Sequence, residues 1–176
     1  MNSFFDLLKN RRSIRKYLPQ AVESEKISKI TKAVLMSPAS KRSNPWEFIV
    51  VQDKVTLGKL SDSRAHGSQF LADSPLGIVI IADTTKSDIW IEDASIAAII
   101  MQLQAQDLGL GSCWIQIYGR EKDENTTSEE YIRDLLSIPT HYAVLNIISI
   151  GYPNEERKPY DEEKLPSEKI HTEKFS

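Results

Sequence analysis

The chain has 176 residues, of which 40% are hydrophobic and 27% charged, and its formal net charge is -3. This length and composition predict one soluble globular domain, and the slightly acidic balance argues against a nucleic-acid-binding protein. The N-terminus lacks the pattern of a signal peptide, no apolar run approaches the roughly 20 residues of a membrane span, and the single cysteine, Cys113, excludes an intrachain disulfide, so we expect a cytoplasmic protein.

The N-terminal third of the chain is expected to hold two helices, a polar loop and a strand. A short apolar helix pattern at residues 4–8 precedes the basic stretch Arg11–Tyr17. The spacing over 23–36 predicts an amphipathic helix that ends before Ser37-Pro38, because the residue before a proline disfavours the α conformation. Residues 37–46 are too polar for the core, and 47–52 read as a strand buried on both faces.

The middle of the chain contains the most apolar segments. Residues 54–72 are expected to be helical in two pieces, Lys54–Ser61 and about 63–72, and 76–82 form a clear strand followed by a polar loop at 83–88. The helix expected over 91–108 is apolar on nearly every face, so it should be buried within this domain or against a partner chain. Gly109 provides its expected end.

The C-terminal part is expected to hold two more strands and a helix. A glycine turn at 109–111 leads into a strand that reaches Ile117. Thr127 and Glu130 fit a capping box that begins a helix, and 142–150 form the last strand. The residues from 152 onward are rich in charge and proline and have no core of their own, so they are expected to form an extended tail.

The basic stretch is the best candidate for binding chemistry. Arg11, Arg12 and Arg15 are guanidinium donors that match phosphate oxygens, and Ser13 adds a hydroxyl. The alternative is a solvated basic helix end, in which cations complement the helix dipole.

Other polar residues point to no catalytic group. The three histidines show no metal-ligand spacing, and Glu92 and Asp93 diverge on a helix, so they are expected to favour its N-terminus. Cys113 is expected to be a small buried side chain, with a reactive thiol as the alternative. We therefore expect the chemistry to come from a cofactor.

Four motifs, in order along the chain, resemble those of the nitroreductase family of FMN-dependent oxidoreductases. The stretch from Arg11 to Arg15 resembles its Arg-Arg-Ser-x-Arg signature, and Pro38–Phe48 is similar to its Pro-Ser-Ser-x-Asn-x-Gln-Pro-Trp-x-Phe loop. Gly109–Trp114 resembles a Gly-Leu-Gly-x-x-Trp strand entry, and Gly151-Tyr152-Pro153 a C-terminal Gly-Tyr-Pro segment. Each match is weak alone, but together they span nearly the whole chain.

The resemblance implies an α+β fold with a central mixed or antiparallel sheet flanked by helices. It implies one domain over 1–176, an intertwined homodimer with FMN in each interface cleft, and a tail over 152–176 that extends onto the partner chain. NAD(P)H is the implied co-substrate, and no catalytic side chain or metal is implied because the flavin carries the chemistry.

The resemblance also implies roles for particular residues. Arg11, Arg12, Ser13 and Arg15 would hold the phosphate, ribityl chain and pyrimidine edge, and Lys158, or less readily Arg157, would return from the tail to the phosphate. The partner chain would contribute the loop with Pro38, Ala39, Ser40, Arg42 and Asn44. The strand residues Cys113, Trp114, Ile115 and Gln116 would lie against the flavin ring, where a backbone N–H can bond N5, and Gln69 would reach the ring's edge.

The chain departs from the family pattern at several positions. Arg42 and Asn44 stand where the family commonly has Asn and Gln, so Arg42 either adds charge near the cofactor or points to solvent. Gln116-Ile117 replaces the Glu-Gly of some members. The short chain leaves little room for an inserted lid, which favours an open pocket.

The implied reaction has two steps, in which NAD(P)H reduces the flavin and an electron-poor acceptor such as a nitroaromatic or quinone then reoxidises it. Alternatives are a specialised relative, such as a dehalogenase, an enone reductase or an enzyme that fragments flavin. A flavin-binding sensor without turnover and a dimeric scaffold without cofactor are further alternatives.

Overall fold

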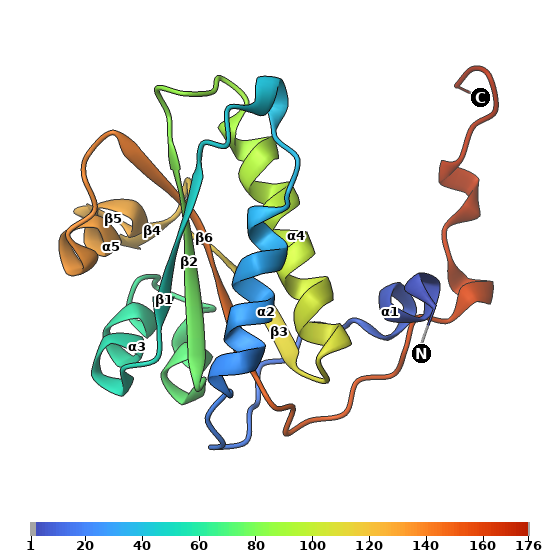
Figure 1. The fold of residues 1–176 in the computed structure, drawn as a ribbon, viewed down its shortest axis with the longest axis horizontal. Helices are drawn as coiled ribbons and strands as arrows, with labels where there is room; N and C mark the ends of the chain where they lie inside the picture. The colour runs from blue at the N-terminus through green and yellow to red at the C-terminus, as the bar shows by residue number, and fades with distance from the viewer. Residues whose placement is uncertain (1–2, 176) are drawn as a thin grey trace.

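The computed structural model describes residues 3–175 and shows a four-stranded antiparallel sheet between two layers of helices (Figure 1). The strands lie in the order β1-β2-β6-β3. Their bounds are Trp46–Val51 for β1, Leu76–Asp83 for β2, Tyr142–Gly151 for β6 and Gly111–Gln116 for β3. The two central strands, β2 and β6, are buried along almost their whole length because helices cover both faces of the sheet. The predicted α+β fold is thus confirmed, with the sheet antiparallel.

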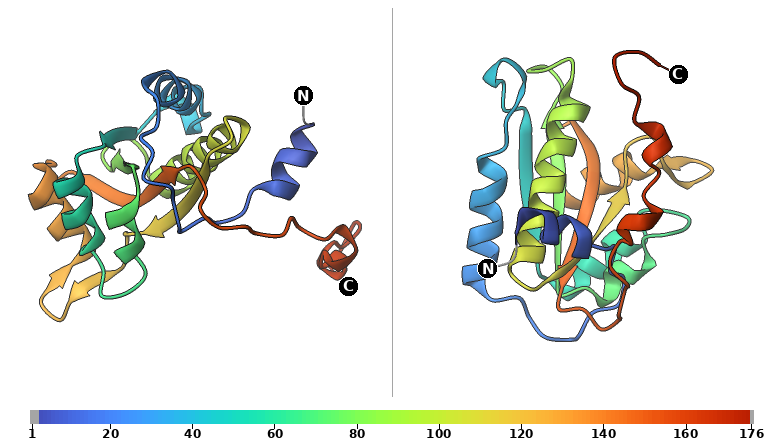
Figure 2. Two further views of the ribbon diagram at one scale, coloured as in Figure 1. Left: turned by 90° about the horizontal axis from the view of Figure 1, so that it is seen from below. Right: turned by 90° about the vertical axis from the view of Figure 1, so that its right-hand side faces the viewer.

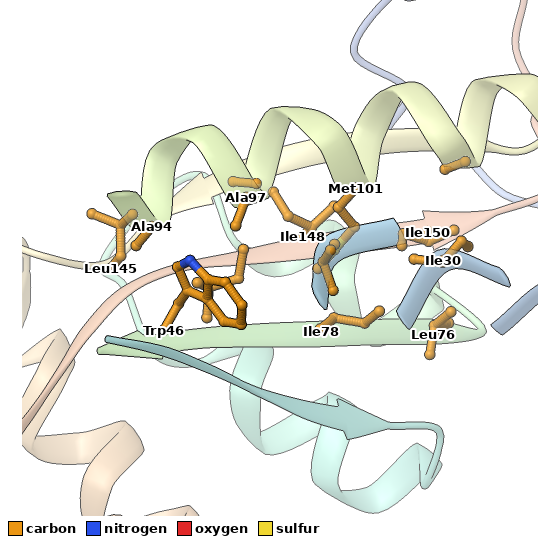
Figure 3. Close-up of a cluster of buried hydrophobic side chains, with 14 of the residues drawn as sticks. Ile30, Trp46, Leu76, Ile78, Ala94, Ala97, Met101, Leu145, Ile148 and Ile150 are labelled. Atoms are coloured by element: carbon orange, nitrogen blue, oxygen red, sulfur yellow. The ribbon is translucent and has the colours of Figure 1, made fainter. Parts of the chain in front are cut away.

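One face of the sheet packs against α2 (Ser24–Leu35) and α4 (Trp90–Asp107). Figure 3 shows their side chains meeting those of β2 and β6 in a core that includes Ile30, Ile78, Met101 and Ile148. Small residues on α4 line this contact and let the helix approach the sheet closely: Ala94, Ala97, Ala98 and Ala105 are all fully buried. The outward-facing Ile91, Ile96 and Ile99 are each 38–40% exposed. Within the single chain α4 is therefore not buried on every face, and burial of these isoleucines against a partner chain stays a prediction.

The other face packs against α3 (Lys54–Ser61), α5 (Ser128–Leu136) and a 3-10 turn at Gln69–Asp73. The predicted capping box is present, because the Thr127 hydroxyl accepts from Glu130 N and the Glu130 carboxylate accepts from Thr127 N. A hairpin of β4 (Glu121–Asp123) and β5 (Thr126–Thr127), which the sequence analysis did not predict, precedes α5.

Two elements extend away from this layered body. Figures 1 and 2 show α1 (Phe4–Asn10) and the C-terminal tail beside each other and apart from the sheet. Lys9 joins them, since its ammonium lies 2.6 Å from the Glu162 carboxylate and its carbonyl accepts from Tyr160 N. Between residues 154 and 175 the helical structure of the tail is limited to two 3-10 turns, Glu162–Lys164 and Ser167–Lys169, as expected for a segment without a core.

Most predicted boundaries are confirmed, including the end of α2 before Ser37-Pro38 and the left-handed Gly109, with φ 74°, after α4. Two predictions were wrong. β1 is an edge strand whose Val50 is 39% exposed, so it is not buried on both faces. The second helical piece, about 63–72, is a series of bends followed by the 3-10 turn at Gln69–Asp73. No helix between residues 3 and 175 combines the length and apolar character needed to cross a membrane.

Two glycines let the basic stretch lie directly against the sheet. A Cβ at Gly111 would come within 2.8 Å of Ile14, and one at Gly151 within 2.7 Å of Pro75 and 2.9 Å of Tyr17. Real Cβ contacts are not this short, so any larger residue would push the stretch or the strand aside. These positions fix where Arg11–Arg15 lie.

We expect Gly111→Ala to lower the free energy of unfolding by about 1–3 kcal/mol, the usual cost of inserting a methyl group into a well-packed contact. Chemical denaturation measures this change. The matched control is Gly58→Ala in α3, where an added Cβ meets nothing within 4 Å and should stabilise the helix by roughly 0.5–1 kcal/mol. An equal effect at both positions would contradict the close-contact argument.

Candidate functional site

The basic stretch runs in an extended conformation beside β3. Ser13 forms a parallel bridge with Ser112, and Ile14 N donates to Ser112 O at 3.0 Å. Tyr17 holds the C-terminal end of the basic stretch in place, because its buried hydroxyl lies 2.6 Å from Ile14 O and 2.7 Å from Ser149 Oγ. Burial raises the Tyr17 pKa, so the phenol stays protonated and can donate one of these bonds. Arg11 is the C-cap of α1, since its N–H donates to Leu7 O at 2.9 Å, and the residues after it are extended beyond the helix.

The guanidinium groups of Arg11, Arg12 and Arg15 lack a carboxylate partner in the described part of the chain. Within residues 3–175, no acidic side chain lies within 4.0 Å of the guanidinium of Arg11, Arg12 or Arg15. Arg12 donates to the carbonyl of Lys158 and lies 4.5 Å from the centre of the Tyr160 ring. Uncompensated cations close together in sequence form a site suited to an anion.

A carboxylate from the tail fixes the backbone of this stretch. Glu155 Oε1 accepts from Arg15 N at 2.6 Å and from Lys16 N at 3.1 Å, and Oε2 lies 2.7 Å from the Arg157 guanidinium. Partial burial raises the Glu155 pKa, but these hydrogen bonds and Arg157 outweigh it and leave the pKa below its usual value. Arg157 is thus neutralised locally, whereas no carboxylate of the described chain pairs with Lys158.

The free edge of β3 continues the site. Ser112 points its carbonyl away from β6, toward Ile14, and strand alternation turns the backbone of Trp114 and Gln116 to the same side. Their side chains are joined, since Trp114 Nε1 donates to Gln116 Oε1 at 2.9 Å. The bridge to Ser13 occupies the outer edge of β3 at Ser112. Beyond Ser112 this edge is open, and the backbone N–H of Trp114 faces it. Ile115 is fully buried behind it.

Cys113 lies between the basic stretch and the core and is only 2% exposed. Burial raises its thiol pKa, while Arg15, the Ser13 hydroxyl and Arg11 act in the opposite direction. A thiol with a raised pKa is a poor nucleophile, so the structure favours the small buried side chain over the reactive alternative. The described residues also contain no group of three or more His, Cys, Asp or Glu placed to hold a metal ion.

The polar loop at 38–44 has an unusual backbone. Lys41, Arg42 and Asn44 have φ values of 51°, 56° and 42°, in the left-handed region. This conformation costs a non-glycine residue roughly 1–2 kcal/mol, less for asparagine, so surrounding contacts must hold the loop in place. Its 3-10 turn at Ser40–Arg42 is attached to α4, because Ser40 N donates to Asp93 Oδ1 at 2.9 Å.

The predicted site residues fall into two groups at opposite ends of α4. Ser40 contacts the first turn of this helix, whereas the basic stretch lies beside Ser112, just beyond its last turn (Figure 1). A helix of 18 residues is about 27 Å long. One chain therefore brings together Arg11–Arg15, β3 and Lys158, but not Pro38, Ala39, Ser40, Arg42 or Asn44.

Gln69 belongs to neither group, and its side-chain amide is already hydrogen-bonded within its own loop. Its Oε1 accepts from Gly67 N at 2.8 Å, and its Nε2 lies 3.3 Å from Arg64 O. The amide closes its own loop in this structure, so the predicted contact with a ring edge would require these bonds to open. The neighbouring Phe70 is closer to the site, with its ring centre 6.0 Å from the Arg15 guanidinium.

The residues of the first group fit the phosphate of FMN. Three guanidinium groups, a Ser hydroxyl and a Lys ammonium without a carboxylate partner supply the charge and the donors that a phosphate dianion requires. The open edge of β3 adds a backbone donor, the N–H of Trp114. No residue of this group would have to give up an ion pair to accept the phosphate.

Sequence reasoning missed three residues that position these groups. Tyr17 and Glu155 hold the basic stretch, and Asp93 holds the loop. Only Glu155 had a sequence signal, its place two residues after the Gly-Tyr-Pro segment. Asp93 and Glu92 both lie in the first turn of α4, as predicted, but Asp93 is buried whereas Glu92 is exposed.

Comparisons with known proteins agree with this geometry. The family model described as "Nitroreductase family" matches residues 8–67 and 56–152. A candidate NADH dehydrogenase/NAD(P)H nitroreductase from Archaeoglobus fulgidus is 35% identical over 180 residues, covering 99% of this chain and all of that protein.

Solved structures show the same similarity. An FMN-dependent nitroreductase from Clostridium difficile R20291 is 53% identical, with a TM-score of 0.96 and coverage of 97% of this chain and 99% of that chain. A candidate NADH dehydrogenase/NAD(P)H nitroreductase from Parabacteroides distasonis is 32% identical, with a TM-score of 0.90 and coverage of 99% and 100%.

We expect Glu155→Gln to lower the free energy of unfolding at pH 7 by about 1 kcal/mol, because the charged acceptor of two backbone N–H groups is lost. The Glu155 pKa is lowered on folding, so its contribution is present above the ordinary Glu value of about 4.5 and is lost as the pH falls below it. The difference between wild type and variant should therefore shrink below pH 4.5. Denaturation at several pH values measures it, and a difference that grows on acidification would contradict the assignment.

Proposed function

This chain belongs to the nitroreductase family, and from that premise we propose that it is an FMN-dependent oxidoreductase that passes electrons from NAD(P)H to nitroaromatics, quinones or similar acceptors. The main support for the proposal is the set of guanidinium groups that lack a carboxylate partner in the described chain and lie beside the open edge of β3. Relatives named for FMN and for NAD(P)H support both partners, among them an FMN reductase (NADPH) from Bacillus subtilis that is 25% identical.

The phosphate end of FMN is assigned to the basic stretch and the tail. Arg11, Ser13 and Lys158 would contact the phosphate and the adjoining ribityl chain. Arg12 would bind there while keeping its bond to the Lys158 carbonyl, since a guanidinium has five N–H donors. Lys158 is a better candidate than Arg157 because Arg157 is already paired with Glu155.

The ring end of FMN is assigned to β3 and Arg15. Cys113, Trp114, Ile115 and Gln116 would lie against the ring, with an outward N–H such as that of Trp114 available to N5. Arg15 would lie at the pyrimidine end. A fixed cation there stabilises negative charge on a reduced flavin, which favours reduction.

The second half of the site is assigned to a partner copy of this chain. The loop with Pro38, Ala39, Ser40, Arg42 and Asn44 lies at the opposite end of α4 from the basic stretch, and this helix is about 27 Å long, so the loop is too far away to complete the site of its own chain. Apolar side chains left exposed on α1, α4 and the tail support such a dimer: Phe4, Phe5, Leu8, Ile96, Ile99, Leu165 and Ile170.

When bound, FMN supplies the electron chemistry by accepting a hydride from NAD(P)H and returning electrons to an acceptor. The protein residues bind the phosphate, orient the ring against β3 and place Arg15 where charge develops. No side chain of the site is placed as a dedicated general acid, so substrate protons would come from solvent. One open face would serve donor and acceptor in turn, which is the basis for a two-step mechanism.

The mutational test compares Arg11→Ala and Arg15→Ala with the control Lys16→Ala, which removes the same charge from an exposed side chain of the same stretch. Arg11→Ala should weaken FMN binding by about ten- to a hundredfold, as expected for the loss of a charged hydrogen bond to phosphate. Arg15→Ala should lower the flavin reduction potential. Titration of flavin fluorescence and reductive titration measure the two effects, and a Lys16→Ala variant as defective as Arg11→Ala would contradict the assignment.

The activity test uses the visible spectrum of the purified protein. A yellow protein bleached anaerobically by NADH or NADPH, and recoloured by a nitroaromatic or quinone, is the expected result. A yellow protein that neither donor bleaches would instead favour a specialised relative or a sensor. A colourless protein that cannot be reconstituted with FMN would refute the phosphate site.

A further inference from the structure

Asp93 is a buried carboxylate outside the residues so far assigned to FMN. It lies in the first turn of α4, is 2% exposed and has no cation within 4.0 Å among the described residues. Its two oxygens are occupied by two other segments: Oδ1 accepts from Ser40 N at 2.9 Å, and Oδ2 accepts from Ser87 Oγ at 3.1 Å. Burying an unpaired charge is costly, so these bonds indicate a specific role.

The bond to Ser40 holds the most unusual backbone of the chain. Ser40 begins the turn that contains the left-handed residues Lys41 and Arg42 and precedes the left-handed Asn44. Beyond Asn44 the loop is attached again, since Asp83 N donates to Pro45 O at 2.8 Å. Between these two attachments, the loop's backbone hydrogen bonds are internal, from Arg42 N to Ala39 O and from Ser43 N to Ser40 O.

Ser87 extends the network to the loop before α4. Its hydroxyl donates to Asp93 and accepts from Ile89 N at 3.3 Å. Asp93 thus connects three segments: the 38–44 loop, the loop after β2 and the start of α4. A residue that only favoured the helix dipole would need none of these bonds, as the exposed Glu92 beside it illustrates.

From this network we propose that Asp93 is a positioning residue for FMN, one that acts through the 38–44 loop on the flavin site of the partner chain. This inference rests on the proposed function, because it uses the assignment of that loop to the partner's flavin. Asp93 does not touch the cofactor itself. It sets the backbone of Ser40, and thereby the direction in which Ser40, Arg42 and Asn44 extend toward the partner.

The first test compares three variants by FMN titration. Asp93→Ala removes the acceptor of Ser40 N and should raise the FMN Kd by about tenfold or more, the change expected for a hydrogen bond to a charged group. Asp93→Asn should restore binding to near the wild-type value, because its carbonyl can accept from Ser40 N and its amide can donate to Ser87 Oγ. Glu92→Ala, which removes the neighbouring helix charge, is the matched control and should leave the Kd unchanged.

The second test asks on which chain Asp93 acts. Co-expressed chains with different affinity tags give mixed dimers of known composition. A dimer with Arg11→Ala in one chain and Asp93→Ala in the other would have one doubly damaged site and one intact site, so it should bind one FMN with wild-type affinity. A dimer of wild type with a chain carrying both substitutions would have two damaged sites and no FMN bound at that affinity.

Each other outcome overturns the proposal. The opposite pattern would mean that Asp93 acts on its own chain's site, and equal binding by both mixed dimers would mean that it only stabilises the fold. An Asp93→Asn variant as weak as Asp93→Ala would exclude the hydrogen-bond network as the cause. A wild-type protein that binds no FMN would instead refute the proposed function, so the two failures are distinguishable.

Discussion

The close contact between the basic stretch and the edge of the sheet is the constraint on which the site depends. An extended segment can lie this near a strand only where the strand has no side chain in the way, and Gly111 and Gly151 provide those two places. Ile14 and Tyr17 fill the space that the glycines leave, and the side chains of Arg15 and Lys16 between them are exposed. The charge pattern of the site is therefore a result of packing, which fixes the backbone before any anion binds.

Much of the fold could be predicted from the sequence because it depends on local signals. Proline after α2, glycine after α4 and the capping box of α5 each determine an element boundary through the conformation of one or two residues. The errors arose where tertiary context decides. Val50 is apolar enough for a central strand, but β1 lies at the edge of the sheet, and the order of strands is not visible in their composition.

In the candidate site too, local sequence signals could be predicted, whereas features that depend on tertiary context could not. The arginines and the serine proposed to bind phosphate are close together in sequence, so their chemistry was visible as a motif. Asp93 and Glu155 act on residues 53 and 140 positions away, through the backbone N–H groups of Ser40 and Arg15. Such bonds leave no sequence pattern, because any backbone N–H can be the donor. Residues that position a site through bonds to backbone N–H groups are for this reason harder to predict than residues whose own side chains would bind the ligand.

The length of α4 also has a thermodynamic consequence. A site whose halves lie at opposite ends of this helix, and are completed by a second chain, ties cofactor binding to self-association. In the proposed dimer, FMN would strengthen the association of the two chains by the same factor by which their association strengthens FMN binding. On dilution of such a dimer, chain separation and flavin release would be one coupled equilibrium, in which free FMN in the surrounding solution preserves the assembly.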